Sequence, residues 1–167
     1  MALVQVGHRQ FDIDTVVFDK DGTLIDFNHL WLSRTQALVE SLVQRSHTAR
    51  TNQFENPADI HALLYRSLGV DPLSRRVLAD GPLATIPRHK LMFIVATVLY
   101  QHGWSWHDAE NEAEQQFAAI MTARPGADEI RSIGDVGALL ARLNQVGITT
   151  TVATSDDRMP TEATLAL

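Results

Sequence analysis

Two short β-branched runs and several helical stretches are visible in the pattern of apolar and polar positions. Residues 15–18 (TVVF) and 148–153 (ITTTVA) are each typical of a strand, and the first run suits a strand buried on both faces in a parallel sheet. Between them, apolar residues recur at three- and four-residue spacing from 28 to about 46, which predicts an amphipathic helix. The order of strand, helices and strand predicts an α/β fold.

Turn and capping residues divide the remaining chain into further helices. Apolar patterns predict helices over 58–68 and 87–101. Further helices are expected to begin at the following positions: Asp71-Pro72 (a short one), Ser105, Asp135 and Pro160. Gly147 is the expected end of the helix that Asp135 opens.

The helical stretches interrupt what otherwise reads as a strand–helix–strand unit. We therefore predict three segments: 1–26 with the first strand and the loop after it, 27–127 as an inserted helical domain, and 128–167 with a helix, the second strand and the start of another helix. No internal repeat is visible.

Two carboxylates follow the first strand directly, in the loop Asp19-Lys20-Asp21-Gly22. Open parallel sheets bind their ligands at the carboxyl ends of their strands, and residues i and i+2 of an extended chain point the same way. One carboxylate could attack a phosphoryl group while the second moves protons, and the pair would attract Mg²⁺. The alternative is an acidic turn in which Asp21 and Gly22 only shape the bend.

The residues around this loop resemble the signature motifs of a known family. Residues 16–24 (VVFDKDGTL) resemble the first signature motif, hhhDxDGT[LV], of the haloacid dehalogenase (HAD) superfamily, and 148–154 look like its second, a strand that ends in Thr or Ser. The helical insert lies where that superfamily has its helical (type 1) cap, as in the phosphoglycolate phosphatase-like branch. The resemblance implies a Rossmannoid parallel sheet with an all-helical cap, and a phosphatase rather than the rarer phosphomutase.

The resemblance also implies roles for individual residues. Asp19 would be the phosphoryl-accepting nucleophile and Asp21 the general acid/base. Mg²⁺ would bind the Asp19 carboxylate and the backbone carbonyl of Asp21. Thr154, the backbone N–H of Ser155 and the loop at Gly22 would hold the phosphoryl group of a small phosphorylated metabolite.

Two further family motifs find no clear counterpart: a Lys or Arg that neutralises phosphate, and a strand that ends in metal-binding acids. Neither Lys20 nor Lys90 is placed for the first role, and Arg158 lies too close to Thr154. Asp156 and Asp157 are expected on a solvated loop rather than at a metal.

The chain thus reads as the first part of a HAD protein, which leaves a second hypothesis open: a truncated, catalytically incomplete chain that acts as a binding module or is inactive alone. In either case we expect poor hydrolysis of p-nitrophenyl phosphate and an open sheet edge that favours self-association.

Composition narrows the remaining classes. Fourteen Lys and Arg against 20 Asp and Glu give a net charge of −6, which argues against nucleic-acid binding. There is no cysteine, so disulfides and thiolate metal sites are excluded, and the seven histidines show no HExxH spacing. We expect a soluble cytoplasmic protein with no membrane association. Five basic residues of the insert are expected to be ordinary solvated surface, with contact to an anionic substrate across the cleft as the alternative for some of them: Arg75, Arg76, Arg88, His89 and Lys90.

Overall fold

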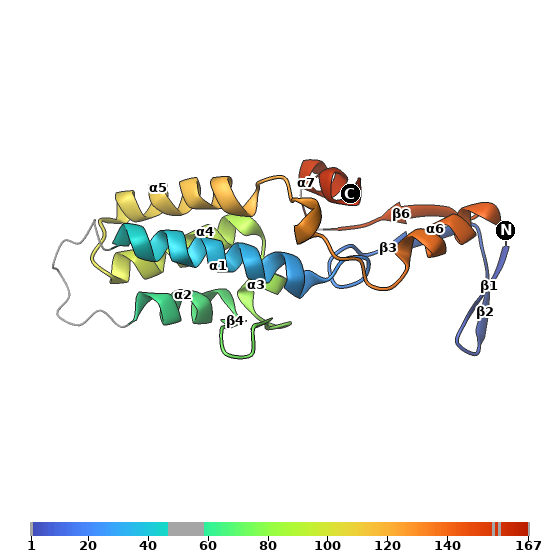
Figure 1. Cartoon of the computed structure of the whole chain (residues 1–167), viewed down its shortest axis with the longest axis horizontal. Helices are drawn as coiled ribbons and strands as arrows, with labels where there is room; N and C mark the ends of the chain where they lie inside the picture. Colours follow the sequence, from blue (N-terminus) through green and yellow to red (C-terminus); the bar gives the residue numbers. More distant parts are fainter. Residues whose placement is uncertain (1, 47–58, 155, 157, 167) are drawn as a thin grey trace.

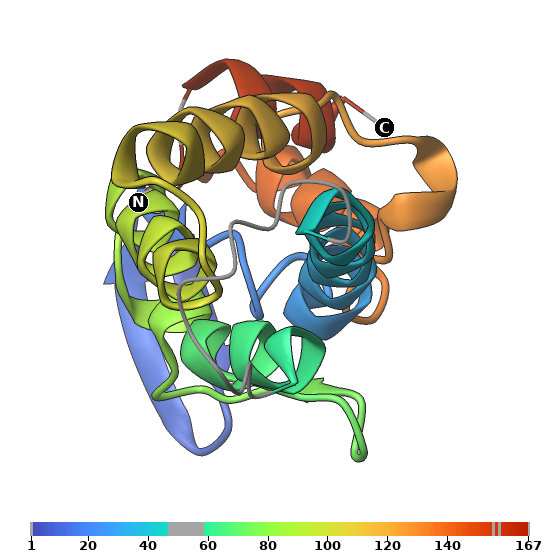
Figure 2. The ribbon, with the colours of Figure 1, turned by 90° about the vertical axis from the view of Figure 1, so that its left-hand side faces the viewer.

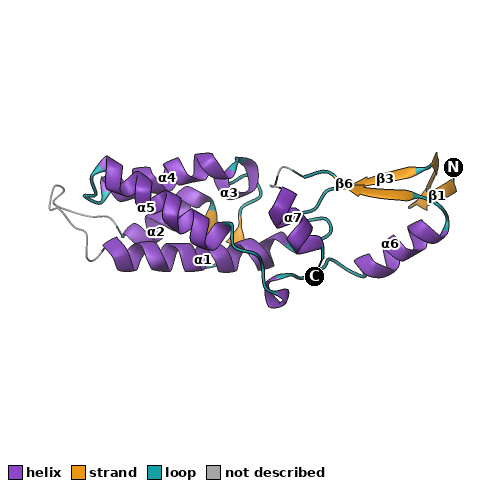
Figure 3. Cartoon of the chain, turned by 90° about the horizontal axis from the view of Figure 1, so that it is seen from above, coloured by secondary structure: helices purple, strands orange, loops and turns teal. Residues whose placement is uncertain are grey.

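The chain is elongated, with a helical bundle at one end and strands at the other (Figure 1). The computed structural model describes residues 2–46, 59–154, 156 and 158–166. Figure 3 shows the separation by element type: the bundle helices are grouped together, whereas α6 (Val136–Gln145) runs beside the strands. Among the described helices, none combines the length and apolarity that crossing a bilayer requires.

The predicted parallel pair of strands is confirmed. β3 (Thr15–Phe18) and β6 (Thr149–Val152) pair in parallel, with Phe18 opposite Val152. The N–H of Ala153 donates to the carbonyl of Phe18 at 2.9 Å, so the ladder continues to the point where both chains leave the sheet. The carboxyl ends of the two strands therefore lie side by side, and the fold is α/β as expected.

The helix before β6 begins and ends where its sequence predicts. Asp135 caps α6, because its Oδ1 accepts the N–H of Ala138 at 2.9 Å. Gly147 follows the helix with a φ of +75°, a left-handed conformation that costs glycine little. The chain can therefore turn directly into β6, against which α6 packs.

The bundle consists of α1 (Phe27–Ser46), α2 (Ile60–Leu68), α4 (Arg88–Gln101) and α5 (Trp106–Gln116). A π-helical turn, η1 (Phe117–Met121), extends α5, and the short α3 (Pro82–Thr85) precedes α4. Figure 2 looks along the bundle and shows these helices around a common axis. Apolar side chains fill the interior, among them Leu38, Leu42, Leu64, Leu68, Val95 and Leu99, which are fully buried.

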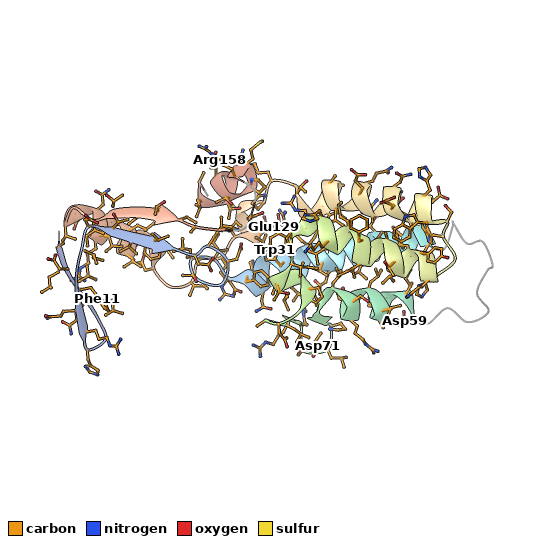
Figure 4. All side chains as sticks on the ribbon, turned by 180° about the vertical axis from the view of Figure 1, so that it is seen from behind. Phe11, Trp31, Asp59, Asp71, Glu129 and Arg158 are labelled. Carbon is orange, nitrogen blue, oxygen red and sulfur yellow. The ribbon has the colours of Figure 1, made fainter. Side chains whose placement is uncertain are left out.

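The two ends of the chain add smaller elements. η2 (Ala127–Glu129) leads from the bundle back to α6, and α7 (Arg158–Leu165) follows β6. An antiparallel hairpin of β1 (Ala2–Val6) and β2 (Arg9–Ile13) precedes β3. Sequence analysis did not predict this hairpin, and its Phe11 lies at the strand end of the molecule, far from the bundle (Figure 4).

Two sequence-based expectations about local structure are wrong. Residues 70–77 form a small hairpin, β4 (Val70–Asp71) with β5 (Arg76–Val77), and not a helix. The side chain of Asp71 accepts the N–H of Leu73 and the hydroxyl of Ser74, which stabilises a turn instead of a helix start. In addition, β3 is not buried on both faces, because the side chain of Val17 is 60% exposed.

Candidate functional site

Asp19 and Asp21 lie in a tight loop immediately after β3. Gly22 adopts a φ of +83°, which a residue with a Cβ rarely does, and its N–H donates to Ile25 O at 2.8 Å. The carbonyl of Lys20 accepts the N–H groups of Leu24 and Ile25 at 2.9 and 3.1 Å. These bonds close the loop on itself, and both carboxylates line one cavity.

Each carboxylate has its own hydrogen-bond donor. The hydroxyl of Thr23 donates to Asp19 Oδ2 at 3.3 Å, and Asp19 remains exposed. The indole N–H of Trp31, on α1, donates to Asp21 Oδ1 at 3.4 Å. The more exposed Asp19 is therefore open to a ligand, whereas Asp21 is oriented by the bundle.

Thr154 lines the same cavity from the neighbouring strand. Its Oγ1 accepts the N–H of Asp156 at 3.2 Å, which leaves the hydroxyl proton available for a ligand. The structure thus brings together Asp19, Asp21 and Thr154, as predicted, while Ser155 and Asp157 lie outside the described residues.

Lys20 is the unexpected feature of the site, because it is fully buried. Its Nζ lies 2.7 Å from Asp21 Oδ2 and 3.3 Å from Asp156 Oδ2, although neither contact has the angles of a hydrogen bond. A lysine is seldom buried without a partner, and here two carboxylates balance its charge. Lys20 is not among the residues that line the cavity, so it contacts Asp21 and Asp156 without facing the cavity itself.

Asp156 also contacts the bundle. Its Oδ1 lies 3.4 Å from Arg88 Nη2 at the start of α4. The expectation of a solvated loop is wrong for Asp156, whose side chain is only 14% exposed, and the expectation of solvated surface is wrong for Arg88 at 24%. The three charged groups Lys20, Asp156 and Arg88 therefore join the loop after β3, the loop after β6 and the bundle.

The cavity has a volume of about 1240 Å³ and lies between the strand ends and the bundle. Its floor carries Asp19, Asp21 and Thr154, and its bundle wall carries apolar side chains together with Arg76, Arg88 and His89. Conversely, Arg75 and Lys90 are exposed and do not line it. A cavity with an apolar wall and a few convergent polar groups is the usual form of a small-molecule site.

The donor set for a metal is small. The described residues contain no group of three or more His, Asp or Glu side chains that could enclose an ion. The carboxylate of Asp19 and the backbone carbonyl of Asp21 are nevertheless oxygen donors on one loop, and such hard donors are those that Mg²⁺ prefers. Two protein ligands also suit this ion, since Mg²⁺ usually keeps several waters and binds substrate phosphate.

A buried ion pair fixes the return from the bundle. Arg34, on α1, donates from Nε to Glu129 Oε1 at 3.1 Å and from Nη2 to Oε2 at 3.3 Å, and its Nη1 donates to Met121 O at 3.2 Å. Burial raises the pKa of Glu129, but hydrogen bonds from Arg34 and from the N–H of Gly126 outweigh this effect and lower the pKa below its usual value. Figure 4 shows Glu129 and Trp31 where the bundle meets the rest of the chain.

Sequence reasoning missed Lys20, Asp156 and Arg88 as members of the site. Position 20 lies between two predicted site residues, and a lysine next to a buried strand end is itself a signal for a paired, buried cation. For Arg88, 68 residues from Asp156, the sequence offers no such signal.

Comparison with known proteins agrees with this geometry. The family model of the haloacid dehalogenase-like hydrolases matches residues 13–167, which include both strands, the loop with Asp19 and Asp21, and the whole bundle. No curated protein matches the chain in a sequence search. The match covers nearly all of the sequence, so the chain belongs to the haloacid dehalogenase-like hydrolases.

Proposed function

We propose that the protein is a Mg²⁺-dependent phosphomonoester hydrolase that acts on a small phosphorylated metabolite through an aspartyl-phosphate intermediate. One observation carries the proposal: Asp19, Asp21 and Thr154 line a single cavity at the carboxyl ends of two paired parallel strands. This edge is where open α/β sheets bind ligands, and family membership supports hydrolysis as the reaction.

In the first step, an oxygen of Asp19 attacks phosphorus and the bond from phosphorus to the ester oxygen breaks. Asp21 gives a proton to the departing alkoxide, so the alcohol leaves neutral. The products are the alcohol, aspartyl-phosphate at Asp19 and an ionised Asp21. Asp19 suits this role because it is the more exposed of the two carboxylates.

In the second step, water attacks the phosphorus of the aspartyl-phosphate. Asp21 takes a proton from that water, the bond from phosphorus to Asp19 breaks, and inorganic phosphate leaves. Asp21 is therefore protonated again and Asp19 is free. Trp31 and Lys20 hold the Asp21 carboxylate at one orientation, which favours a proton transfer in each direction.

The other residues of the cavity supply charge and position. The Thr154 hydroxyl donates to the phosphoryl oxygens, and such a fixed donor stabilises charge that develops during transfer. The carboxylate of Asp19 and the backbone carbonyl of Asp21 would hold Mg²⁺, which would neutralise phosphate charge when bound. The segment 27–127 acts as a cap, since its helices provide the opposite wall of the cavity.

A covalent-capture experiment tests the mechanism even if turnover is slow. The protein is mixed with p-nitrophenyl phosphate and Mg²⁺, quenched in acid and analysed by intact mass and peptide mapping. We expect a phosphoryl group on Asp19 and release of p-nitrophenol. Asp19→Asn should lose both signals and lower turnover by orders of magnitude, because an amide is a poor nucleophile.

Arg75→Ala is the matched control, because Arg75 is exposed and does not line the cavity. It should retain labelling and turnover. Unchanged turnover in Asp19→Asn would exclude the covalent mechanism. Phosphate binding without labelling or turnover would instead support the second hypothesis, a HAD-like binding module.

A further inference from the structure

The cavity extends far beyond the space that a phosphoryl group needs. Its volume of about 1240 Å³ exceeds the roughly 300–1,000 Å³ of sites that enclose drug-sized ligands. Asp19 and Thr154 mark one end, while α1, α3, α4, η1 and the segment 74–79 contribute to the rest of the wall. The remaining space is available to the group esterified to phosphate.

Part of the bundle wall around this space is apolar. Half-buried side chains line it from three elements: Phe27 and Trp31 on α1, Ile86 after α3, and Met92 on α4. The two rings lie 6.2 Å apart at 45°, which leaves an aromatic corner near Asp21. Apolar surface inside a concave site is stabilised when an apolar ligand removes it from water.

The polar side chains on the same wall already bond to the protein. Asn28 Oδ1 accepts the N–H of Val77 at 2.7 Å. Three hydroxyl protons are donated internally: from Ser74 to Asp71 Oδ2, from Thr85 to Gly81 O, and from Thr122 to Ala118 O. A sugar or other polyhydroxylated group would therefore lose hydration there with little return.

The charged side chains on the wall do not reverse this preference for an apolar group. Arg88 is engaged by Asp156 at the catalytic end, where it favours an anion near the phosphoryl position. Arg76 and His89 are exposed, so water already solvates them. Glu114 also lines the cavity, and its charge disfavours a second anionic group in the body of the ligand.

We infer that the substrates are phosphomonoesters of a bulky apolar or aromatic alcohol, whose apolar body packs on Trp31, Ile86 and Met92 while its phosphoryl group lies at Asp19. This inference rests on the proposed phosphatase function, and it names the class of ester that the bundle selects.

The test compares two phosphonates that share the charged head group and differ in the apolar body. Benzylphosphonate and methylphosphonate are titrated into the protein with Mg²⁺ by isothermal calorimetry. The benzyl compound should bind at least about ten-fold more tightly, because it adds six non-hydrogen atoms that an apolar wall can cover. Phosphonates are not hydrolysed, so the result does not depend on turnover.

Variants on one helix locate the effect. Met92→Gln should reduce the ratio of the two affinities several-fold. Phe93→Gln should not, because Phe93 is 51% exposed and does not line the cavity. The ratio in the unmodified protein decides the matter if Met92→Gln fails to fold.

Each outcome separates the inference from the proposed function. Equal affinity for both phosphonates would overturn the apolar substrate class and leave the phosphoryl site intact. Absence of binding by either compound would overturn the phosphoryl site itself, and the inference with it. A high ratio that Met92→Gln and Phe93→Gln lower equally would place the apolar contact elsewhere and contradict the assignment to this wall.

Discussion

The ion pair between Arg34 and Glu129 should contribute far more to stability than the shorter pair between Arg158 and Glu162. The first pair has an N–O distance of 3.1 Å, and its side chains are 7% and 29% exposed. The second has a distance of 2.6 Å, but its side chains are 88% and 62% exposed. Burial, not distance, decides the outcome, because water competes little for the first guanidinium.

The expected magnitude follows from the bonds that each substitution removes. Arg34→Met loses three donated hydrogen bonds, two of them to a carboxylate, and bonds to charged groups are each worth about 1.5–3 kcal/mol. Because Glu129 is part-exposed and regains some hydration, we expect a total loss of about 2–4 kcal/mol. Arg158→Met should cost less than about 0.5 kcal/mol, as is usual for exposed i, i+4 pairs.

Acid should reduce the difference between Arg34→Met and the unmodified protein, although the bond from Arg34 to Met121 O does not depend on Glu129. The pKa of Glu129 is lowered in the folded chain, so its ionised form stabilises the fold above the unfolded carboxyl pKa of about 4.3. That contribution disappears as the pH falls through the lowered pKa. Urea unfolding at about pH 7 and about pH 3.5 measures both effects. Equal losses in Arg34→Met and Arg158→Met, or a loss that stays constant with pH, would refute the reasoning.

Two further substitutions test local packing by urea unfolding. Gly69→Ala should lower the free energy of unfolding by about 2–4 kcal/mol, because the φ of Gly69 is +76° and a Cβ would lie 2.7 Å from Gly81 Cα. Gly147→Ala should lower it by only about 1–2 kcal/mol, because Gly147 has a similar φ of +75° but no neighbouring atom within 4 Å of the added Cβ. Equal losses in the two variants would contradict the predicted clash at Gly69. Lys20→Met should lower the free energy of unfolding by about 1–3 kcal/mol. This is less than the cost of leaving a fully buried charge without its partner, because Asp21 and Asp156 retain some contact with water. An unchanged unfolding midpoint in Lys20→Met would show that neither ion pair contributes.

The site residues that could be predicted are those that follow directly after a recognisable strand. Asp19 and Asp21 follow the first strand within a few residues, and Thr154 lies two residues after the second, so the sheet alone brings them together. The N-terminal hairpin was also within reach, since Gly7 lies in a two-residue turn with a φ of +60°, between the apolar run 2–6 and a segment in which Phe11 and Ile13 alternate with polar residues.

Contacts between distant segments could not be predicted in this way. The pairing of Arg88 with Asp156 depends on how the start of α4 is placed over the strand ends, which no local pattern encodes. Lys20 illustrates a different limit. Its polarity suggests solvent, and only the convergence of two carboxylates from separate loops makes its burial favourable.

The position of Asp156 places charged groups of the bundle and of the loop after β3 in one electrostatic network. A single carboxylate is shared between Lys20 on one side and Arg88 on the other, so each cation changes the field that the other experiences. Loss of Arg88 from this arrangement would leave the Asp156 charge to Lys20 alone and would weaken the interaction of Lys20 with Asp21. By reciprocity, any ligand that reorganises the carboxylates of the loop alters the affinity of α4 for the strand ends. Under the proposed mechanism, proton transfer at Asp21 and enclosure of the ligand are therefore thermodynamically linked through Asp156, a side chain that performs neither.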